Sequence, residues 1–150
     1  MATLKQYART QVFQDFLSVY PLCFGYWKKY AEAEAKAGFV DKAFEVYEQG
    51  VGGVPYECNL WTAYADFYEK HRPDDPSTLR TILKRAISIT GEGYHSGEVW
   101  NKLIALEEKR GSKLDLADVY RRAIRIPLPN HSTLVQRYSH TSEKCFRFDG

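Results

Sequence analysis

The sequence predicts an all-α fold, a right-handed α-solenoid of antiparallel helix pairs. Two sets of bulky residues recur at long, similar intervals. Tryptophans lie 34 and 39 residues apart, and a second set lies 36 and 37 apart: Trp27, Trp61 and Trp100, then Tyr47, Leu83 and Tyr120. Around each of them, apolar residues are spaced three and four apart, which is typical of helices. A repeat of this length made of two helices buries its apolar side by stacking on its neighbours.

The composition fits one folded, non-membrane array over residues 1–150. With 44% hydrophobic residues the chain has material for a continuous core. Its net charge of +2 indicates no general attraction to nucleic acids or membranes. Cys23, Cys58 and Cys145 are too few and too scattered for a disulfide framework or a zinc site, which favours a reducing compartment. We expect no signal peptide and no transmembrane segment.

The register of the repeats divides the chain into six segments. They are a half-repeat helix over 5–21, a first repeat over 22–55, a second over 56–94, a third over 95–129, the start of a fourth over 130–142, and a tail over 143–150. The helix over 5–21 ends at Pro21 and has the pattern of the second helix of a preceding pair. In the last helix, Leu134 lies where a fourth tryptophan would fall.

Helix ends are predicted from capping residues. The predicted helices cover 5–20, 24–37, 41–51, 60–70, 76–90, 97–110, 114–126 and 131–142, with a loop over 91–97. Gly38 and Gly111 are the predicted C-terminal caps. The predicted N-caps are Asp41, Asn59, Asp75 followed by Pro76, and Ser96.

The residues that follow each tryptophan distinguish two kinds of helical repeat. A tetratricopeptide repeat has Leu-Gly at plus three and plus four and Tyr at plus seven. Here plus three is Tyr30, Tyr64 and Leu103, and plus seven is Glu34, Tyr68 and Glu107. A bulky residue at plus three with glutamate at plus seven resembles the half-a-TPR (HAT) repeat.

The second helices resemble the same repeat. Their pattern is an aromatic residue, two polar residues and a small residue, with a proline further on: Tyr47 to Gly50 with Pro55, Leu83 to Ala86 without a proline, and Tyr120 to Ala123 with Pro127. The small residues are expected where the two helices of a repeat approach closely. The tryptophans could stack on nucleic-acid bases, but their helical spacing favours the core. The expected core signature is Trp27, Tyr30, Glu34, Tyr47, Gly50, Trp61, Tyr64, Leu83, Ala86, Trp100, Leu103, Glu107, Tyr120 and Ala123.

One block is more specific. YPLCFGYWKKYAEAE, residues 20–34, resembles the first full repeat of the pre-mRNA-processing factor 39 family, splicing proteins associated with the U1 small nuclear ribonucleoprotein (U1 snRNP). The resemblance implies a nuclear, non-catalytic scaffold that docks U1 snRNP proteins for 5′ splice-site recognition. It also implies a match to only the N-terminal array of longer proteins, which pair through their C-terminal array. A HAT scaffold of 3′-end cleavage or ribosome biogenesis is the alternative.

The sequence shows no catalytic, metal or cofactor set. Glu34 and Glu107 belong to different repeats with no nucleophile beside them, so we interpret them as buried carboxylates, opposite Gln49 and Arg122 respectively. His71, His95, His131 and His140 lack the spacing of metal ligands, and no glycine-rich phosphate loop occurs.

Basic residues are the candidates for partner binding. They are Lys28, Lys29, Arg80, Lys84, Arg85, Arg121 and Arg125. Those on the second helices could align into a basic stripe. Such a stripe can be an ordinary solvated face, a contact for an acidic protein segment, or a contact for an RNA backbone.

Overall fold

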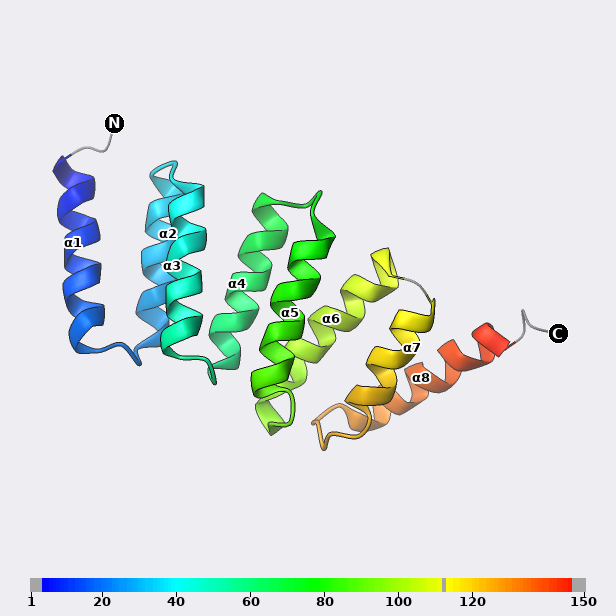
Figure 1. The fold of residues 1–150 in the computed structure, drawn as a ribbon. Helices are drawn as coiled ribbons and strands as arrows, with labels where there is room; N and C mark the ends of the chain where they lie inside the picture. The colour runs from blue at the N-terminus through cyan, green and yellow to red at the C-terminus, as the bar shows by residue number, and fades with distance from the viewer. Residues whose placement is uncertain (1–3, 112, 147–150) are drawn as a thin grey trace. The chain divides into compact units, whose positions relative to one another are not determined.

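The computed structural model describes residues 4–111 and 113–146, and every element in those ranges is helical (Figure 1). The elements are α1 (Leu4–Val19), α2 (Phe24–Lys36), α3 (Val40–Gly53), α4 (Cys58–His71), α5 (Pro76–Thr90), the short 3₁₀ turn η1 (Tyr94–Ser96), α6 (Gly97–Arg110), α7 (Lys113–Ala123) and α8 (His131–Phe146). The predicted fold class, an α-solenoid of antiparallel helix pairs, is confirmed.

The chain forms two compact units, Met1–Pro73 and Asp74–Gly150. In the first unit α2 packs against α1, α3 and α4, and α3 also packs against α4. In the second unit α5 packs against α6, α6 against α7, and α7 against α8. Consecutive helices within each unit run in opposite directions (Figure 1). The boundary between the units falls inside the predicted second repeat, between α4 and α5.

Two predicted helix ends are confirmed in detail. Gly38 follows α2 with a φ of +94°, and the amide of Phe39 donates to the carbonyl of Glu34 at 2.9 Å, which closes the turn. At the start of α5, the Asp75 carboxylate accepts from the amide of Thr78 at 3.2 Å, and a proline occupies the first turn.

The predictions of Asp41 and Asn59 as N-caps were wrong. The N-cap of α3 is Phe39, two residues before Asp41, because the turn at Gly38 lets the helix begin at Val40. Asp41 therefore lies in the first turn, where it pairs with Arg72 at 2.8 Å. Helix α4 begins at Cys58, and the carboxylate of Glu57 accepts from the amide of Asn59 at 3.2 Å.

Ser96 holds the N-cap position of α6, as predicted, but its side chain does not cap the helix. Its buried hydroxyl donates instead to the carbonyls of Gly91 at 3.1 Å and Gly93 at 2.6 Å. Ser96 therefore folds the segment before α6 back on itself, and part of the predicted loop over 91–97 becomes the turn η1. Helix α8 continues past the predicted end at 142 to Phe146, and residues 147–150 lie outside the described residues.

The periodic positions form the core of both units. Trp61 is 1% exposed and Trp100 is 2% exposed, and Leu134, at the position of a fourth tryptophan, is fully buried. Also buried are Tyr30, Glu34, Tyr47, Gly50, Tyr64, Leu83, Ala86, Leu103, Glu107, Tyr120 and Ala123. Trp27 is only half-buried, because the loop before it, residues 20–22, is itself exposed.

Each tryptophan holds the loop that precedes its own helix. The indole N–H of Trp27 donates to the carbonyl of Pro21 at 2.9 Å, and that of Trp61 donates to the carbonyl of Pro55 at 2.8 Å. Trp100 opens the third repeat and follows the second, which lacks the proline, and its indole N–H donates to the carbonyl of Gly91 at 3.0 Å. The bond therefore joins the end of one helix pair to the start of the next.

Helix α1 packs as the second helix of a preceding pair would. The rings of Phe13 and Tyr30 stack with centroids 5.3 Å apart and an angle of 14° between planes. Thirty-four residues on, Tyr47 and Tyr64 stack at 5.3 Å and 12°. The same contact thus joins α1 to α2 and α3 to α4, which supports the half-repeat interpretation of α1.

Gly50 marks a close approach of α3 to Trp27 of α2. A Cβ built on Gly50 would lie 3.1 Å from Cγ and 3.2 Å from Cβ of Trp27, inside ordinary van der Waals distance. A residue without a side chain therefore lets α3 lie directly against the indole ring.

Candidate functional site

The buried carboxylate of Glu34 ties α2 to α1. Its Oε1 accepts from the hydroxyl of Thr10 at 2.6 Å and its Oε2 accepts from the amide nitrogen of Gln6 at 3.4 Å. The predicted partner Gln49, on the second helix of the same repeat, was wrong. Glu34, seven residues after Trp27, lies on the face of α2 that packs against the preceding helix α1, as does the stacked ring of Tyr30.

The buried carboxylate of Glu107 makes the equivalent contact in the second unit. Glu107 accepts from Nε of Arg80 at 2.5 Å and from Nη2 at 3.5 Å, so α6 is tied to α5 by a charge-assisted pair. The predicted partner Arg122 was wrong for the same geometric reason. Its guanidinium lies over the ring of Trp100, 5.7 Å from the centroid.

The middle joint uses aromatic rings at the same position. Tyr68 replaces the glutamate of the other repeats, and its ring lies 5.2 Å from that of Phe44 on α3. Phe44 lies 34 residues after Thr10, and Tyr68 lies 34 residues after Glu34. The contact between Tyr68 and Phe44 therefore occupies the same repeat positions as the contact between Glu34 and Thr10, with aromatic side chains in place of polar ones. These positions therefore act as structural joints between helices.

The described part of the chain offers no metal site. No group of three His, Cys, Asp or Glu side chains among those residues is close enough to hold a metal ion. His131, one of the histidines considered above, contacts the carbonyl of Ile124 through Nε2 at 2.6 Å. Within the same ranges, no helix combines the length and the apolar character needed to cross a membrane.

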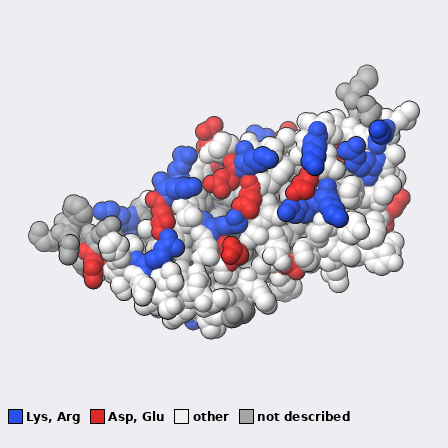
Figure 2. Space-filling model, turned by 180° about the vertical axis from the view of Figure 1, so that it is seen from behind, with Lys and Arg blue, Asp and Glu red and all other residues white. Residues whose placement is uncertain are grey.

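The predicted basic residues of the second unit do not form one continuous exposed set. Arg80 is engaged by Glu107, and its side chain is 29% exposed. Lys84 and Arg85 on α5 and Arg121 on α7 are exposed. Arg125 lines a cavity of about 680 Å³ together with Arg122 and Trp100. On the face drawn in Figure 2, basic and acidic side chains are interspersed, so neither sign of charge dominates it.

The two predicted lysines of α2 have different surroundings. Lys28 pairs with Glu32 at 3.9 Å, and both side chains are about half exposed. The amine of Lys29 lies over the ring of Tyr26, 5.0 Å from its centroid. Of these two lysines, only Lys28 borders a groove that lies between α2 and α4 in the first unit.

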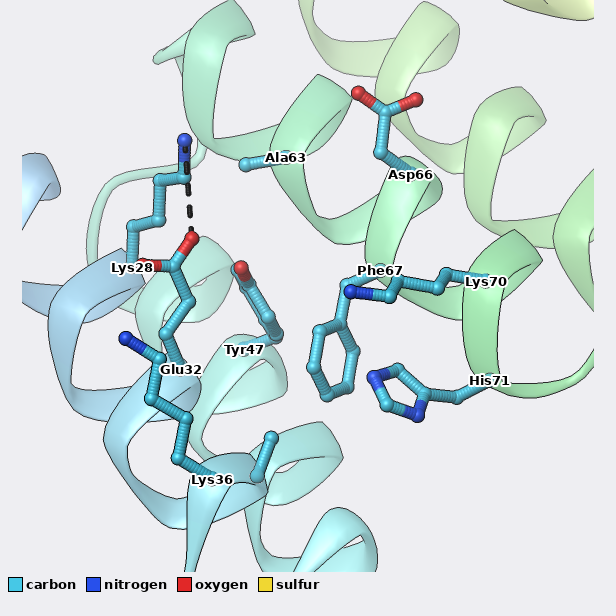
Figure 3. A pocket seen from close by; sticks show the side chains of 10 residues that line it. Lys28, Glu32, Lys36, Tyr47, Ala63, Asp66, Phe67, Lys70 and His71 are labelled. Carbon is cyan, nitrogen blue, oxygen red and sulfur yellow. Dashed lines mark ion pairs between the residues drawn. The ribbon is translucent and has the colours of Figure 1, made fainter.

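This α2–α4 groove is the candidate functional site (Figure 3). It encloses about 550 Å³ and has an apolar floor and a charged rim. It is lined by Lys28, Glu32, Ala35, Lys36, Tyr47, Ala63, Asp66, Phe67, Lys70 and His71. The alanines keep the groove open because they add no atoms beyond Cβ, and the ring of Phe67 is held by those of Tyr47, Phe44 and His71 at 4.3 to 5.2 Å.

The hydroxyl of Tyr47 reaches into the groove from its floor. The Tyr47 side chain comes from α3 and its hydroxyl points into the space between α2 and α4 (Figure 3). Only 1% of the residue is exposed, and no described residue forms a hydrogen bond with that hydroxyl. Burial raises its pKa, and the negative charges of Glu32 and Asp66 raise it further, so the group stays protonated.

The second unit contains the equivalent groove in a filled form. Tyr120 takes the place of Tyr47, but its hydroxyl donates to Oε1 of Glu108 at 2.9 Å. The same oxygen accepts from Nη2 of Arg137 at 2.7 Å. Burial, and then Glu108, raise the pKa of Tyr120 to about 12. This network covers the tyrosine and leaves about 390 Å³.

Sequence reasoning missed the α2–α4 groove, although the sequence contains a signal for it. Glu108 lies eight residues after Trp100, and the residue eight after Trp27 is Ala35. The missing carboxylate leaves the Tyr47 hydroxyl without an acceptor, and the short side chain leaves the groove open.

The chain matches the family model described as "PRP39 N-terminal HAT repeat" over residues 3–140. Pre-mRNA-processing factor 39 of Xenopus laevis is 34% identical over 136 residues, covering 88% of this chain and 21% of the relative. The Homo sapiens protein of the same name is 33% identical over 135 residues, covering 87% of this chain and 20% of the relative. The chain thus spans about a fifth of the length of these relatives.

Two other similarities are more distant. An mRNA 3′-end-processing protein, rna-14 of Neurospora crassa, is 26% identical over 146 residues, covering 85% of this chain and 12% of that protein. A crystal structure of MamA protein superposes with a TM-score of 0.53 at 16% identity, covering 89% of this chain and 70% of that one, which supports the helical-repeat fold alone. Because the family model matches residues 3–140 of the 150 in this chain, the chain belongs to the PRP39 N-terminal HAT repeat family.

Proposed function

We propose that the chain is a non-catalytic protein-interaction scaffold of nuclear pre-mRNA splicing, which docks protein components of U1 snRNP during recognition of the 5′ splice site. The observation that carries the proposal is the family match over residues 3–140, together with relatives named pre-mRNA-processing factors. The contacts described above fit a scaffold, since the glutamates and tryptophans connect helices and leave side chains such as Lys28 at the surface.

The test is recovery of partners from nuclear extract. The tagged chain is incubated with extract that has been treated with ribonuclease, and the retained proteins are identified by mass spectrometry. We expect U1 snRNP proteins to be enriched over a tag-only control, because a scaffold contacts proteins directly and ribonuclease removes RNA bridges. Retention of no U1 protein in treated or untreated extract would contradict the proposal.

A second candidate function is a scaffold of mRNA 3′-end processing. The similarity to rna-14 favours it, at lower identity than the splicing relatives. Enrichment of cleavage factors in place of U1 proteins, in the same experiment, would establish this alternative.

Direct binding of an RNA backbone has less support from the side chains. Arg80, one member of the predicted basic stripe, is paired with the buried Glu107, and Trp61 and Trp100 are too deeply buried to stack on bases. Titration of the chain against RNA at several salt concentrations tests it, since phosphate contacts predict an affinity that falls steeply with salt.

A further inference from the structure

We propose that the α2–α4 groove binds an acidic segment of a partner protein. In this complex an Asp or Glu side chain of the partner accepts a hydrogen bond from the hydroxyl of Tyr47, and a neighbouring apolar side chain packs against Phe67. The proposal rests on the proposed function, since a scaffold binds proteins, and it adds the chemistry of the segment that the groove binds.

The first argument is a donor without an acceptor. Tyr47 is 1% exposed as a residue, its protonated hydroxyl opens to the groove, and that hydroxyl has no hydrogen-bond partner among the described residues. Two other buried tyrosines at inter-helix contacts have a partner: the hydroxyl of Tyr30 accepts from the side-chain amide of Gln14 at 3.3 Å, and that of Tyr64 donates to Glu48 at 2.6 Å. A carboxylate brought by a partner would replace water at this hydroxyl with a charge-assisted hydrogen bond, which is the stronger of the two.

The second argument identifies the acceptor as a carboxylate. In the equivalent groove of the second unit, Tyr120 donates to the carboxylate of Glu108, twelve residues earlier in the chain. The residue twelve before Tyr47 is Ala35, which lines the open groove. A carboxylate from a partner would therefore occupy the space that a side chain of the protein itself occupies in the third repeat.

The third argument is the charge of the rim. Lys36 and Lys70 border the groove, and neither forms an ion pair within the described part of the chain. Figure 3 shows them extending from α2 and α4 on either side of the groove. Lys28 is shared with Glu32 at 3.9 Å in an exposed pair, which is a weak interaction. Against Glu32 and Asp66 the three lysines leave one net positive charge on the rim, which favours an anionic occupant over a basic one.

The fourth argument is the size and composition of the floor. About 550 Å³ accommodates one or two side chains and the backbone that carries them, which suits a short segment. Ala63 and Phe67 offer an apolar surface next to the Tyr47 hydroxyl, so an apolar residue adjacent to the acidic one gains burial. An acidic residue beside an apolar residue is thus the expected recognition element.

The test is selection from a displayed library of random peptides of about twelve residues, using the whole chain as bait. An Ala35→Glu variant serves as the counter-bait, because it restores the carboxylate that the third repeat carries and fills the groove from within. We expect peptides that prefer the unchanged chain to contain Asp or Glu next to an apolar residue. Circular dichroism checks that Ala35→Glu remains helical with an unchanged or higher melting temperature.

One enriched peptide is then synthesised with a fluorescent label and measured by anisotropy. Tyr47→Phe removes only the hydroxyl and should weaken binding by about tenfold or more, the effect of one hydrogen bond to a charged group. Replacing the peptide's acidic residue with its amide should weaken binding to the unchanged chain by a similar factor. The same replacement should weaken binding to the Tyr47→Phe variant only slightly, because the hydrogen bond is already absent there. Lys36→Gln and Lys70→Gln should each reduce affinity and its dependence on salt.

Several results would overturn the inference. They are a selection with no enrichment over Ala35→Glu, enriched peptides that are basic or lack Asp and Glu, and an affinity that Tyr47→Phe leaves unchanged. If Ala35→Glu does not fold, the comparison with Tyr47→Phe alone decides. Failure here with U1 proteins still recovered from extract would reject the groove and leave the scaffold role, whereas acidic peptides that bind without U1 recovery would reject only the splicing assignment.

Discussion

Replacing each tryptophan with phenylalanine should separate the contribution of the indole N–H from that of the ring. The N–H of Trp27, Trp61 and Trp100 donates to a carbonyl that is exposed, half-buried and buried, respectively. Phenylalanine keeps an aromatic ring and removes the donor, and it leaves a similar cavity at the two buried positions, Trp61 and Trp100, so the difference between those two reports on the hydrogen bond. The cost should therefore rise in that order, because an exposed carbonyl regains a bond from water and a buried one does not.

The magnitudes follow from the environment of the acceptor. A net loss of about 0.5–1.5 kcal/mol is typical of one hydrogen bond, and a buried group left unsatisfied adds about 1–3 kcal/mol. We expect less than about 1 kcal/mol at Trp27 and about 2–4 kcal/mol at Trp100, with Trp61 between them. For scale, Trp61→Ala removes the whole buried side chain and should cost about 3–5 kcal/mol.

The assay is urea unfolding of the whole chain followed by far-ultraviolet circular dichroism, which does not depend on the indoles that are changed. The free energies of unfolding are compared with that of the unchanged chain. Equal losses at all three sites, or the largest loss at Trp27, would refute the reasoning that links the cost to burial of the accepting carbonyl. A fully helical Trp61→Ala variant with normal melting would contradict its core position.

Three further changes test other contacts. Gly50→Ala should lower the free energy of unfolding in urea by about 1–3 kcal/mol, because the new methyl group clashes with the adjacent indole. The control is Gly52→Ala at an exposed position of the same helix, where nothing lies within 4 Å of the Cβ, and it should raise that free energy by up to about 1 kcal/mol. Equal effects of the two changes would contradict the close approach at Gly50. Glu107→Gln should cost about 1.5–3 kcal/mol in the same assay, and adding Arg80→Met should recover part of it; no recovery would argue against the pair. Stability should fall between about pH 10 and about pH 12, because the unfolded chain ionises Tyr120 near its ordinary pKa of 10.0 while the folded chain holds it protonated to about 12. Tyr120→Phe should make this part of a pH series of thermal melts less steep, while the raised pKa values of Tyr30 and Tyr47 keep some slope. An unchanged slope would show that the raised pKa of Tyr120 does not contribute.

The fold was predictable because its signal is periodic. Trp61, Trp100 and Leu134 are buried where their spacing placed them, since a helix that stacks on both neighbours needs an apolar residue at regular intervals. Helix ends were predicted less well. Asp75 caps α5 as predicted, but Asp41 does not cap α3, because the turn at Gly38 already sets where that helix begins.

The partners of the buried carboxylates were not predictable from spacing alone. Glu34 and Glu107 were recognised as buried, but spacing within one repeat does not indicate whether position plus seven faces its own second helix or the preceding one. The identities of Thr10 and Arg80 as partners required the packing.

The groove was missed for a different reason. It depends on Ala35, a small residue that is unremarkable within a helix and gains meaning only when Tyr47 and Glu108 are compared across repeats. Charge alone draws attention to lysines and arginines, whereas the groove exists because position 35 has alanine where the third repeat has a glutamate. Comparing each repeat with the others at equal positions is the sequence operation that would have found it.

The bond from each tryptophan to a main-chain carbonyl also bears on how such a chain can change over time. A carbonyl is supplied by every amino acid, so the accepting side of this joint survives any substitution that keeps the loop in place. Gly91 already stands where Pro21 and Pro55 stand in the other two joints, and the bond length is nearly the same. Substitution can remove the indole donor but not the main-chain acceptor. The loops between helix pairs can therefore change in sequence and acquire new contacts while the hydrogen bond is kept.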